Sequence, residues 1–162
     1  MTETWYKSSG TIVYDPPRPK LRKRPDHWVV INADYEIARY FRYWVDKEVL
    51  NPLGFEKGGL AEPSWGAHIS IIRGLNDIRN CPFDWKTIWK RYHGQKVEFE
   101  YSNKVRYTGD TTGHDRPGDY WFVEVRCPLA EQIRDEFKLI RDWSLHLTIG
   151  RTWPDRVVKL KK

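Results

Sequence analysis

Apolar residues recur at helical spacing in three segments of the chain. In residues 34–50 they lie three or four positions apart, and Pro52 follows just beyond the last of them. The same spacing runs through residues 127–140, which begin with a proline suited to a first helical turn. Residues 84–94 repeat the pattern and close on a glycine that suits a C-terminal cap. These patterns predict three helices.

Shorter apolar runs between these segments predict strands. The runs are "TIVY" (11–14), "HWVVIN" (27–32), "YWFVEV" (120–125) and the two segments "HISI" and "LHLTIG". The segment "KVEFEYSNKVRY" alternates apolar residues with glutamates, and it is expected to turn at "SNK" into a second strand. The order strand, helix, strand therefore occurs twice, and both copies end on a strand that contains a histidine.

The composition of the chain favours an anionic partner. The 162 residues suggest one domain, carry a net charge of +6 and include nine tryptophans and nine tyrosines. Residues 15–27 hold four prolines and five basic residues, and they predict an irregular basic loop. Positive charge with many aromatic rings favours nucleotides, because bases stack on aromatic faces.

Several classes of protein are not supported by the sequence. Cys81 and Cys127 form no Cys-x-x-Cys pair, so neither a disulfide framework nor a cysteine zinc site is expected. The first ten residues lack the basic and apolar regions of a secretory leader. No apolar run approaches the roughly 20 residues that span a bilayer. We expect a cytoplasmic protein without a membrane partner.

Two apolar strands carry the same pair of chemically active residues. His68 and Ser70 lie two positions apart in "HISI", and His146 and Thr148 do so in "HLTI". Residues two apart point to one face of a strand. If the two strands lie near each other around a pseudo-two-fold axis, two imidazoles and two hydroxyls converge on one site.

These four side chains suit the cleavage of a phosphodiester without a metal. One neutral histidine can take a proton from the attacking oxygen, and a protonated histidine can give one to the leaving oxygen. The hydroxyls can bind non-bridging phosphate oxygens. A metal site is the alternative, but no His-Glu-x-x-His motif or cluster of aspartates supports it. We expect no cofactor and no metal.

Further residues near the two motifs are candidates for substrate binding. Arg73 and Arg151 each follow their histidine by five residues. This odd offset points away from the histidine in a regular strand, although a glycine beside each arginine could permit a bulge. Tyr14, Trp153 and Trp65 are the candidate rings for stacking on bases.

At this level the chain resembles the two-histidine (2H) phosphoesterase superfamily. The resemblance rests on "HISI" and "HLTI", which match its paired H-x-[ST]-x motifs, with Ser70 in place of the more usual threonine. It implies an α+β, bilobal fold with two pseudo-symmetric antiparallel-sheet lobes, helices on the outside and a central cleft. The lobes would be mainly residues 28–75 and 95–151. His68, Ser70, His146 and Thr148 would be the catalytic residues.

Longer segments resemble the bacteriophage anti-CBASS branch of that superfamily. They are "TIVYDP", "ARYFRYW", "PSWGAHISIIRG" and "LHLTIGR". The resemblance implies metal-independent cleavage of 3′–5′ linkages in cyclic di- and trinucleotide messengers, with linear products that carry a 3′-phosphate. The enzyme would act in the host bacterial cytoplasm and counter anti-phage signalling.

Two other functions remain open at this point. A 2H enzyme could act instead on RNA ends, with 2′,3′-cyclic phosphates or 2′–5′ linkages as substrates. A non-catalytic module could sequester nucleotides and use its histidines only as hydrogen-bonding groups. We expect no stable complex with a long nucleic acid in the leading interpretation.

Overall fold

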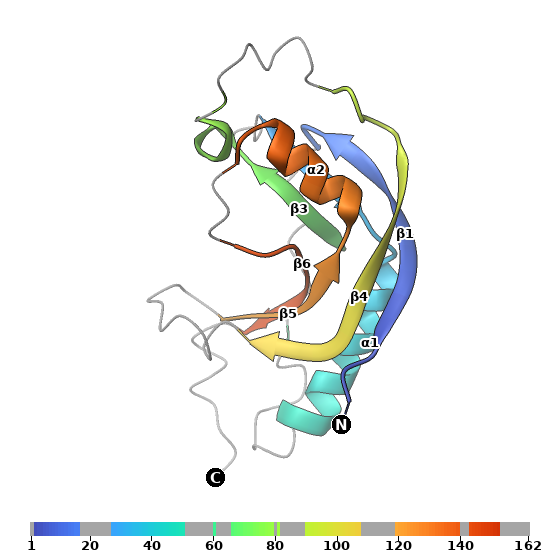
Figure 1. The fold of residues 1–162 in the computed structure, drawn as a ribbon. Coiled ribbons are helices and arrows are strands. Elements are labelled where there is room, and N and C mark those ends of the chain that lie inside the picture. Colours follow the sequence, from blue (N-terminus) through green and yellow to red (C-terminus); the bar gives the residue numbers. More distant parts are fainter. Residues whose placement is uncertain are drawn as a thin grey trace.

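In the part of the chain that the structure describes, six antiparallel strands close into one barrel, and two α-helices accompany it. Figure 1 shows this arrangement. The computed structural model describes residues 2–16, 27–50, 60, 66–79, 81, 90–107, 119–139 and 143–152. Its main elements are β1 (Trp5–Tyr14), β2 (Trp28–Asn32), α1 (Tyr35–Val45), β3 (His68–Arg73), β4 (Lys96–Tyr107), β5 (Asp119–Arg126), α2 (Pro128–Glu136) and β6 (His146–Thr152). Around the barrel the strands follow the order β1-β2-β3-β6-β5-β4.

The predicted bilobal α+β fold with two separate sheets is wrong. The halves predicted at residues 28–75 and 95–151 contribute β2 and β3, and β4, β5 and β6, to one closed sheet. They are joined at two places. β3 pairs with β6, and β1 pairs with both β2 and β4. The closed barrel therefore replaces the two lobes.

β1 closes the barrel because it is long enough to pair with two strands. It is much longer than the strand predicted at residues 11–14. Its second part pairs with β2 from Thr11↔Asn32 to Tyr14↔Val29, and its first part pairs with β4 from Trp5↔Ser102 onward. The first part reads "WYKSSG", which has little apolar alternation. Strand pairing uses backbone N–H and C=O groups, so a polar segment can form it.

β4 is one continuous strand, so the turn predicted at "SNK" is wrong. The register runs from Tyr101↔Val125 to Val105↔Val123, so four positions on β4 match two on β5. Ser102 Oγ accepts a hydrogen bond from the Lys104 N–H at 3.0 Å and donates one to Glu3 Oε1 at 2.6 Å. A bulge absorbs the polar residues, and the strand continues past them.

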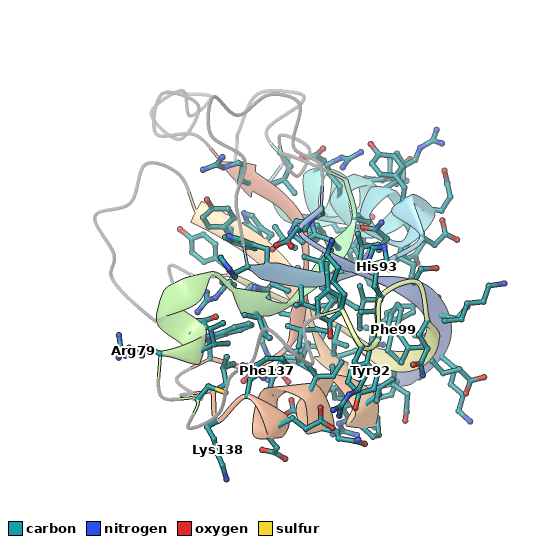
Figure 2. The ribbon with its side chains drawn as sticks, turned by 90° about the horizontal axis from the view of Figure 1, so that it is seen from above. Arg79, Tyr92, His93, Phe99, Phe137 and Lys138 are labelled. Carbon is teal, nitrogen blue, oxygen red and sulfur yellow. The ribbon has the colours of Figure 1, made fainter. Side chains whose placement is uncertain are left out.

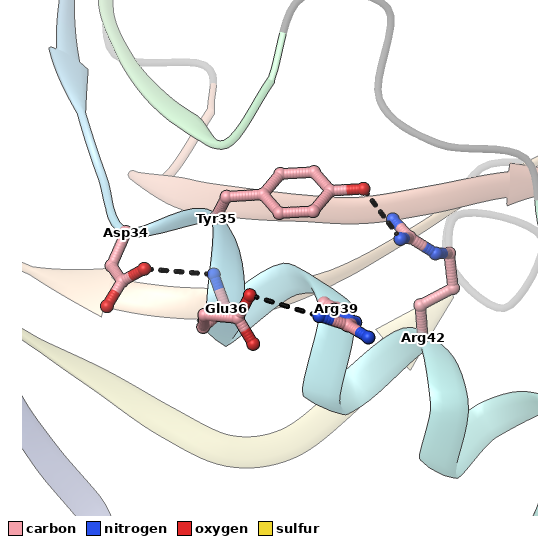
Figure 3. Close-up of polar contacts among 5 residues, drawn as sticks. All are labelled: Asp34, Tyr35, Glu36, Arg39 and Arg42. Carbon is pink, nitrogen blue, oxygen red and sulfur yellow. Dashed lines mark hydrogen bonds and ion pairs between the residues drawn. The ribbon is translucent and has the colours of Figure 1, made fainter.

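Both α-helices within the described residues were predicted from apolar spacing, whereas the short 3-10 helix Leu75–Ile78 was not. α1 begins after Asp34, whose carboxylate accepts a hydrogen bond from the Glu36 N–H at 3.0 Å (Figure 3). It continues into a π-helical turn, Asp46–Leu50, as far as the predicted end. α2 begins with Pro128 and is shorter than predicted. The helix predicted at 84–94 and the basic loop at 15–27 lie mostly outside the described residues.

The helices cover one face of the strands that carry the histidines. α1 packs against β6 and α2 packs against β3. The core cluster joins strand residues such as Ile69 and Leu147 to Phe41 of α1 and Ile133 of α2. Phe99 and Phe137 are buried, whereas Arg79 and Lys138 point outward at the edge of the molecule in Figure 2. Burial of one such side chain contributes about 1.5–3 kcal/mol.

Candidate active site

The two histidine segments are neighbouring antiparallel strands. β3 pairs with β6 at Ile69↔Leu147, and both of these side chains are 0% exposed in the core. Strand alternation therefore places the residues on either side of this pair on the opposite face. That face carries His68, Ser70, His146 and Thr148, which are all partly exposed. We call it the histidine face.

The register also sets which side chains lie across from each other. Extended by one residue in each direction, Ile69↔Leu147 places His68 opposite Thr148 and Ser70 opposite His146. Side chains directly opposite in an antiparallel pair have Cβ atoms roughly 4.5–5.5 Å apart. Each imidazole thus has a hydroxyl beside it on the other strand, and a local two-fold relation passes through the Ile69–Leu147 pair.

Each imidazole is oriented by a contact of the same kind, with the backbone carbonyl two residues before it. His68 Nδ1 lies 3.1 Å from Gly66 O, and His146 Nδ1 lies 2.9 Å from Ser144 O. A carbonyl oxygen only accepts, so Nδ1 carries the hydrogen and donates it in both cases. In the neutral ring this leaves Nε2 without a proton, which makes Nε2 the nitrogen that can accept one.

The surroundings of His146 favour its neutral form. Burial is the main cause that lowers its pKa from the ordinary value of 6.5, and the positive charges of Arg73 and Arg134 lower the pKa further. The hydrogen bond to Ser144 acts in the other direction and raises the pKa. Two rings also contact the imidazole, with centroid distances of 5.2 Å for Phe122 and 6.3 Å for Trp143.

A bulge in β3 brings Arg73 to the histidine face. The register changes from Val30↔Ser70 to Val29↔Ile72, so two positions on β3 match one on β2. Ile71 and Ile72 are consequently both buried, and the alternation shifts by one residue. The Arg73 guanidinium carbon lies 3.7 Å from the centre of the Trp143 ring, beside His146.

β6 has a matching bulge that does the same for Arg151. Its register changes from Phe122↔Thr148 to Trp121↔Gly150, and Ile149 and Gly150 are both buried. Arg151 Nη2 donates a hydrogen bond of 2.8 Å to the hydroxyl of Tyr120. The bulges that the sequence left open are thus present in both strands, and each places an arginine on the side of its histidine.

The structure removes one of the three candidate rings for base stacking and does not describe the other two. Tyr14 is only 3% exposed and belongs to the core cluster, so its ring is not accessible to a base and leaves the set of candidates. Burial raises the pKa of its hydroxyl to about 12. Trp65 and Trp153 lie outside the described residues. His93 is exposed, and its Nδ1 accepts a hydrogen bond from the Tyr14 N–H at 3.1 Å.

Two residues near His146 were missed from the sequence, and a longer repeat could have revealed one of them. "WGAHISIIR" and "WSLHLTIGR" share the pattern W-x-x-H-x-[ST]-I-x-R, in which Trp143 occupies the position of Trp65. Arg134 gives a weaker signal, because it is a charged residue on the apolar face of α2 beside Ile133. The repeated pattern is the stronger of the two signals.

The described residues contain no group of three or more histidine, cysteine, aspartate or glutamate side chains placed to hold a metal ion. Among the helices in the described part of the chain, none has the length and apolar character needed to cross a membrane. In comparisons with known proteins, no family model, no curated protein and no solved structure matches this chain.

Proposed function

We propose that the histidine face cleaves 3′–5′ phosphodiester linkages of cyclic di- and trinucleotides without a metal, leaving linear products with a 3′-phosphate. The observation that carries the proposal is the antiparallel pair Ile69↔Leu147, with two imidazoles and two hydroxyls on the face opposite the core. The choice of cyclic nucleotides follows from the resemblance of the sequence to the anti-CBASS branch of the 2H phosphoesterases. The cellular role proposed with it is to counter anti-phage signalling in the bacterial cytoplasm.

Acid–base catalysis by the two histidines accounts for each proton in the first step. His146 is the base, because burial and nearby positive charge lower its pKa and keep Nε2 free of a proton near neutral pH. It takes the proton of the ribose 2′-hydroxyl as O2′ bonds to phosphorus. The P–O5′ bond breaks, and imidazolium His68 donates its Nε2 proton to O5′. The product is a 2′,3′-cyclic phosphate.

The second step reverses these roles with water as the nucleophile. His68, now neutral, accepts a proton from water while the oxygen of that water bonds to phosphorus. His146, now protonated, returns its proton to O2′ as the P–O2′ bond breaks, which leaves the 3′-phosphate. Both histidines then have their starting protonation states, so the cycle is balanced.

The remaining groups of the histidine face suit the charge of this substrate. The hydroxyls of Ser70 and Thr148 can donate hydrogen bonds to non-bridging phosphate oxygens. Arg73 and Arg151, both brought to this side by bulges, add positive charge to a protein with a net charge of +6. Phe122, beside His146, offers an aromatic ring near the reacting groups.

The test is turnover in EDTA, with products separated by chromatography. We expect 3′,3′-cyclic GMP-AMP to be opened by the wild-type protein, and His68→Ala and His146→Ala to lose the activity while remaining folded. The matched control is His93→Ala, which changes an exposed histidine of the turn before β4 (Figure 2) and should retain turnover.

Other outcomes of this experiment identify the alternatives. Turnover only of an RNA with a 2′,3′-cyclic end contradicts the cyclic substrate and favours an enzyme of RNA ends. Binding without turnover favours a sequestering module. Activity that requires added zinc contradicts the metal-independent mechanism. Full activity in both histidine variants contradicts the assignment of His68 and His146 as catalytic residues.

A further inference from the structure

Arg134 is a buried cation close to the histidine face. Its side chain is 1% exposed, on the core side of α2 between Ala130 and Phe137. Removing a guanidinium from water costs several kcal/mol unless good contacts offset the loss. Nη1 lies 3.3 Å from Glu131 Oε1, and Nη2 donates a hydrogen bond of 2.7 Å to the backbone carbonyl of Trp143.

The ring of Trp143 connects this cation to the site. The Arg134 guanidinium carbon lies 4.2 Å from the ring centre, and that of Arg73 lies 3.7 Å from it. Two guanidinium groups thus contact one indole through cation–π interactions. The same indole meets the imidazole of His146 edge-on, with the ring planes at 77°.

The backbone provides a second connection between the same residues. Arg134 holds the carbonyl of Trp143, and the next carbonyl along the chain, that of Ser144, accepts the Nδ1 hydrogen of His146. The Arg134 guanidinium therefore contacts Trp143 at two points, its backbone carbonyl and its indole ring. Trp143 and Ser144 form the segment that orients the imidazole of His146. Arg134 lies on α2, outside the two histidine strands.

We propose that Arg134 is a positioning residue for His146, acting through Trp143 and Ser144 to hold the imidazole with hydrogen on Nδ1 and Nε2 as the reactive nitrogen. The inference rests on the proposed function, because in that function Nε2 of His146 is the nitrogen that accepts and returns a proton. Arg134 does not touch the reacting atoms. Its planar group stacks on a ring and donates to a carbonyl at the same time, which a lysine ammonium does less well.

The charges around His146 come from several elements. β3 carries Arg73 and His68. Glu124 of β5 is the register partner of His146. Its carboxylate forms an ion pair of 3.2 Å with Arg106 of β4. Glu131 of α2 pairs with Arg134, and Asp77 lies 3.9 Å from the Arg73 side chain. Arg134 adds a positive charge that, after burial and Arg73, lowers the pKa of His146.

The experiment follows the His146 ring by NMR in the full-length protein while the pH is titrated, beside steady-state turnover of 3′,3′-cyclic GMP-AMP. In Arg134→Met we expect the pKa of His146 to rise, because a repelling positive charge is removed, and the share of the Nδ1–H tautomer to fall. We expect kcat to fall roughly 10- to 100-fold, the size of loss that a displaced catalytic group produces. Arg134→Lys should restore the pKa more fully than the tautomer and kcat.

The matched control is Arg126→Met. Arg126 also stacks on a tryptophan, with its guanidinium carbon 3.7 Å from the centre of the Trp5 ring, but it is not among the charges that shift the pKa of His146. We expect wild-type titration and turnover in this variant. A shift of the His146 pKa as large as that in Arg134→Met would overturn the proposal, because it would be a general effect of net charge.

Unchanged titration and tautomer of His146 in Arg134→Met also overturn the proposal. If that variant does not fold, Arg134→Lys decides the question, and a wild-type tautomer together with wild-type kcat counts against positioning. If the wild-type protein cuts no phosphodiester, the proposed function fails. The NMR titration still decides in that case whether Arg134 positions His146.

Discussion

At the scale of single residues, one hydrogen bond determines which nitrogen of each histidine is available. Gly66 and Ser144 each lie two residues before a histidine, and each accepts the Nδ1 hydrogen. Both contacts are to backbone carbonyl groups, so each histidine finds its acceptor in its own segment. The acceptor for each Nδ1 hydrogen thus comes from the segment just before its histidine, and Arg134 of α2 is proposed to keep the Ser144 acceptor in place. The pKa of His146 depends on burial first and then on the charges of Arg73 and Arg134.

The lowered pKa of His146 predicts a dependence of stability on pH. As the pH falls below 6.5, the ordinary pKa of the group, the unfolded chain takes up a proton that the folded chain still excludes. The free energy of unfolding therefore falls until the pH passes the pKa of the folded state. We expect urea unfolding at pH values above and below 6.5 to show this loss, and His146→Gln to lack this part of it. An equal loss in both proteins contradicts the pKa assignment.

At the scale of elements, strand alternation predicted the histidine and hydroxyl pairs but not the sides of the arginines. His68 and Ser70 are two residues apart, and the period of a regular strand is enough to place them together. Arg73 and Arg151 depend on bulges, which add one residue to a strand and reverse its alternation. A bulge is fixed by the register of the neighbouring strand, so the sequence of β3 or β6 alone does not determine it.

The bulge in β4 provides a test at the same scale. Ser102 is 0% exposed, and its hydroxyl donates to Glu3 Oε1 and accepts from the Lys104 N–H. Ser102→Ala leaves a partly buried backbone donor without its acceptor, so we expect a loss of about 1–3 kcal/mol in the free energy of unfolding. Urea unfolding measures it, with Ser9→Ala at an exposed position of β1 as the control. Equal stability of the two variants would contradict a structural role for the hydroxyl.

At the scale of the whole molecule, closure of the barrel is what the sequence did not predict. Local patterns identified β2, β3, β5 and β6, because their apolar residues pack against a core. The pairing of β1 with β4 uses a polar segment, and its partner is about 90 residues away in the chain. Closure brings together elements that the two-lobe prediction kept apart. One resulting contact joins Arg73 of β3 to the ring of Trp143, next to β6, and it follows no local pattern.

Gly10 tests this closure, because it lies where β1 passes from β4 to β2. It pairs with Val97 of β4, and the next residue, Thr11, is the first to pair with β2. A Cβ at position 10 would overlap the carbonyl oxygen of Asn32 and lie 2.6 Å from Ile31 Cγ2.

The backbone oxygen of Asn32 cannot move without displacing β2, so we expect Gly10→Ala to lower the free energy of unfolding by about 1–3 kcal/mol. Urea unfolding beside Ser9→Ala measures the effect. Since β2 pairs in turn with β3, turnover should also fall in Gly10→Ala at temperatures where the protein is still folded. Wild-type stability of Gly10→Ala would contradict the close approach of β1 and β2 on which the barrel depends.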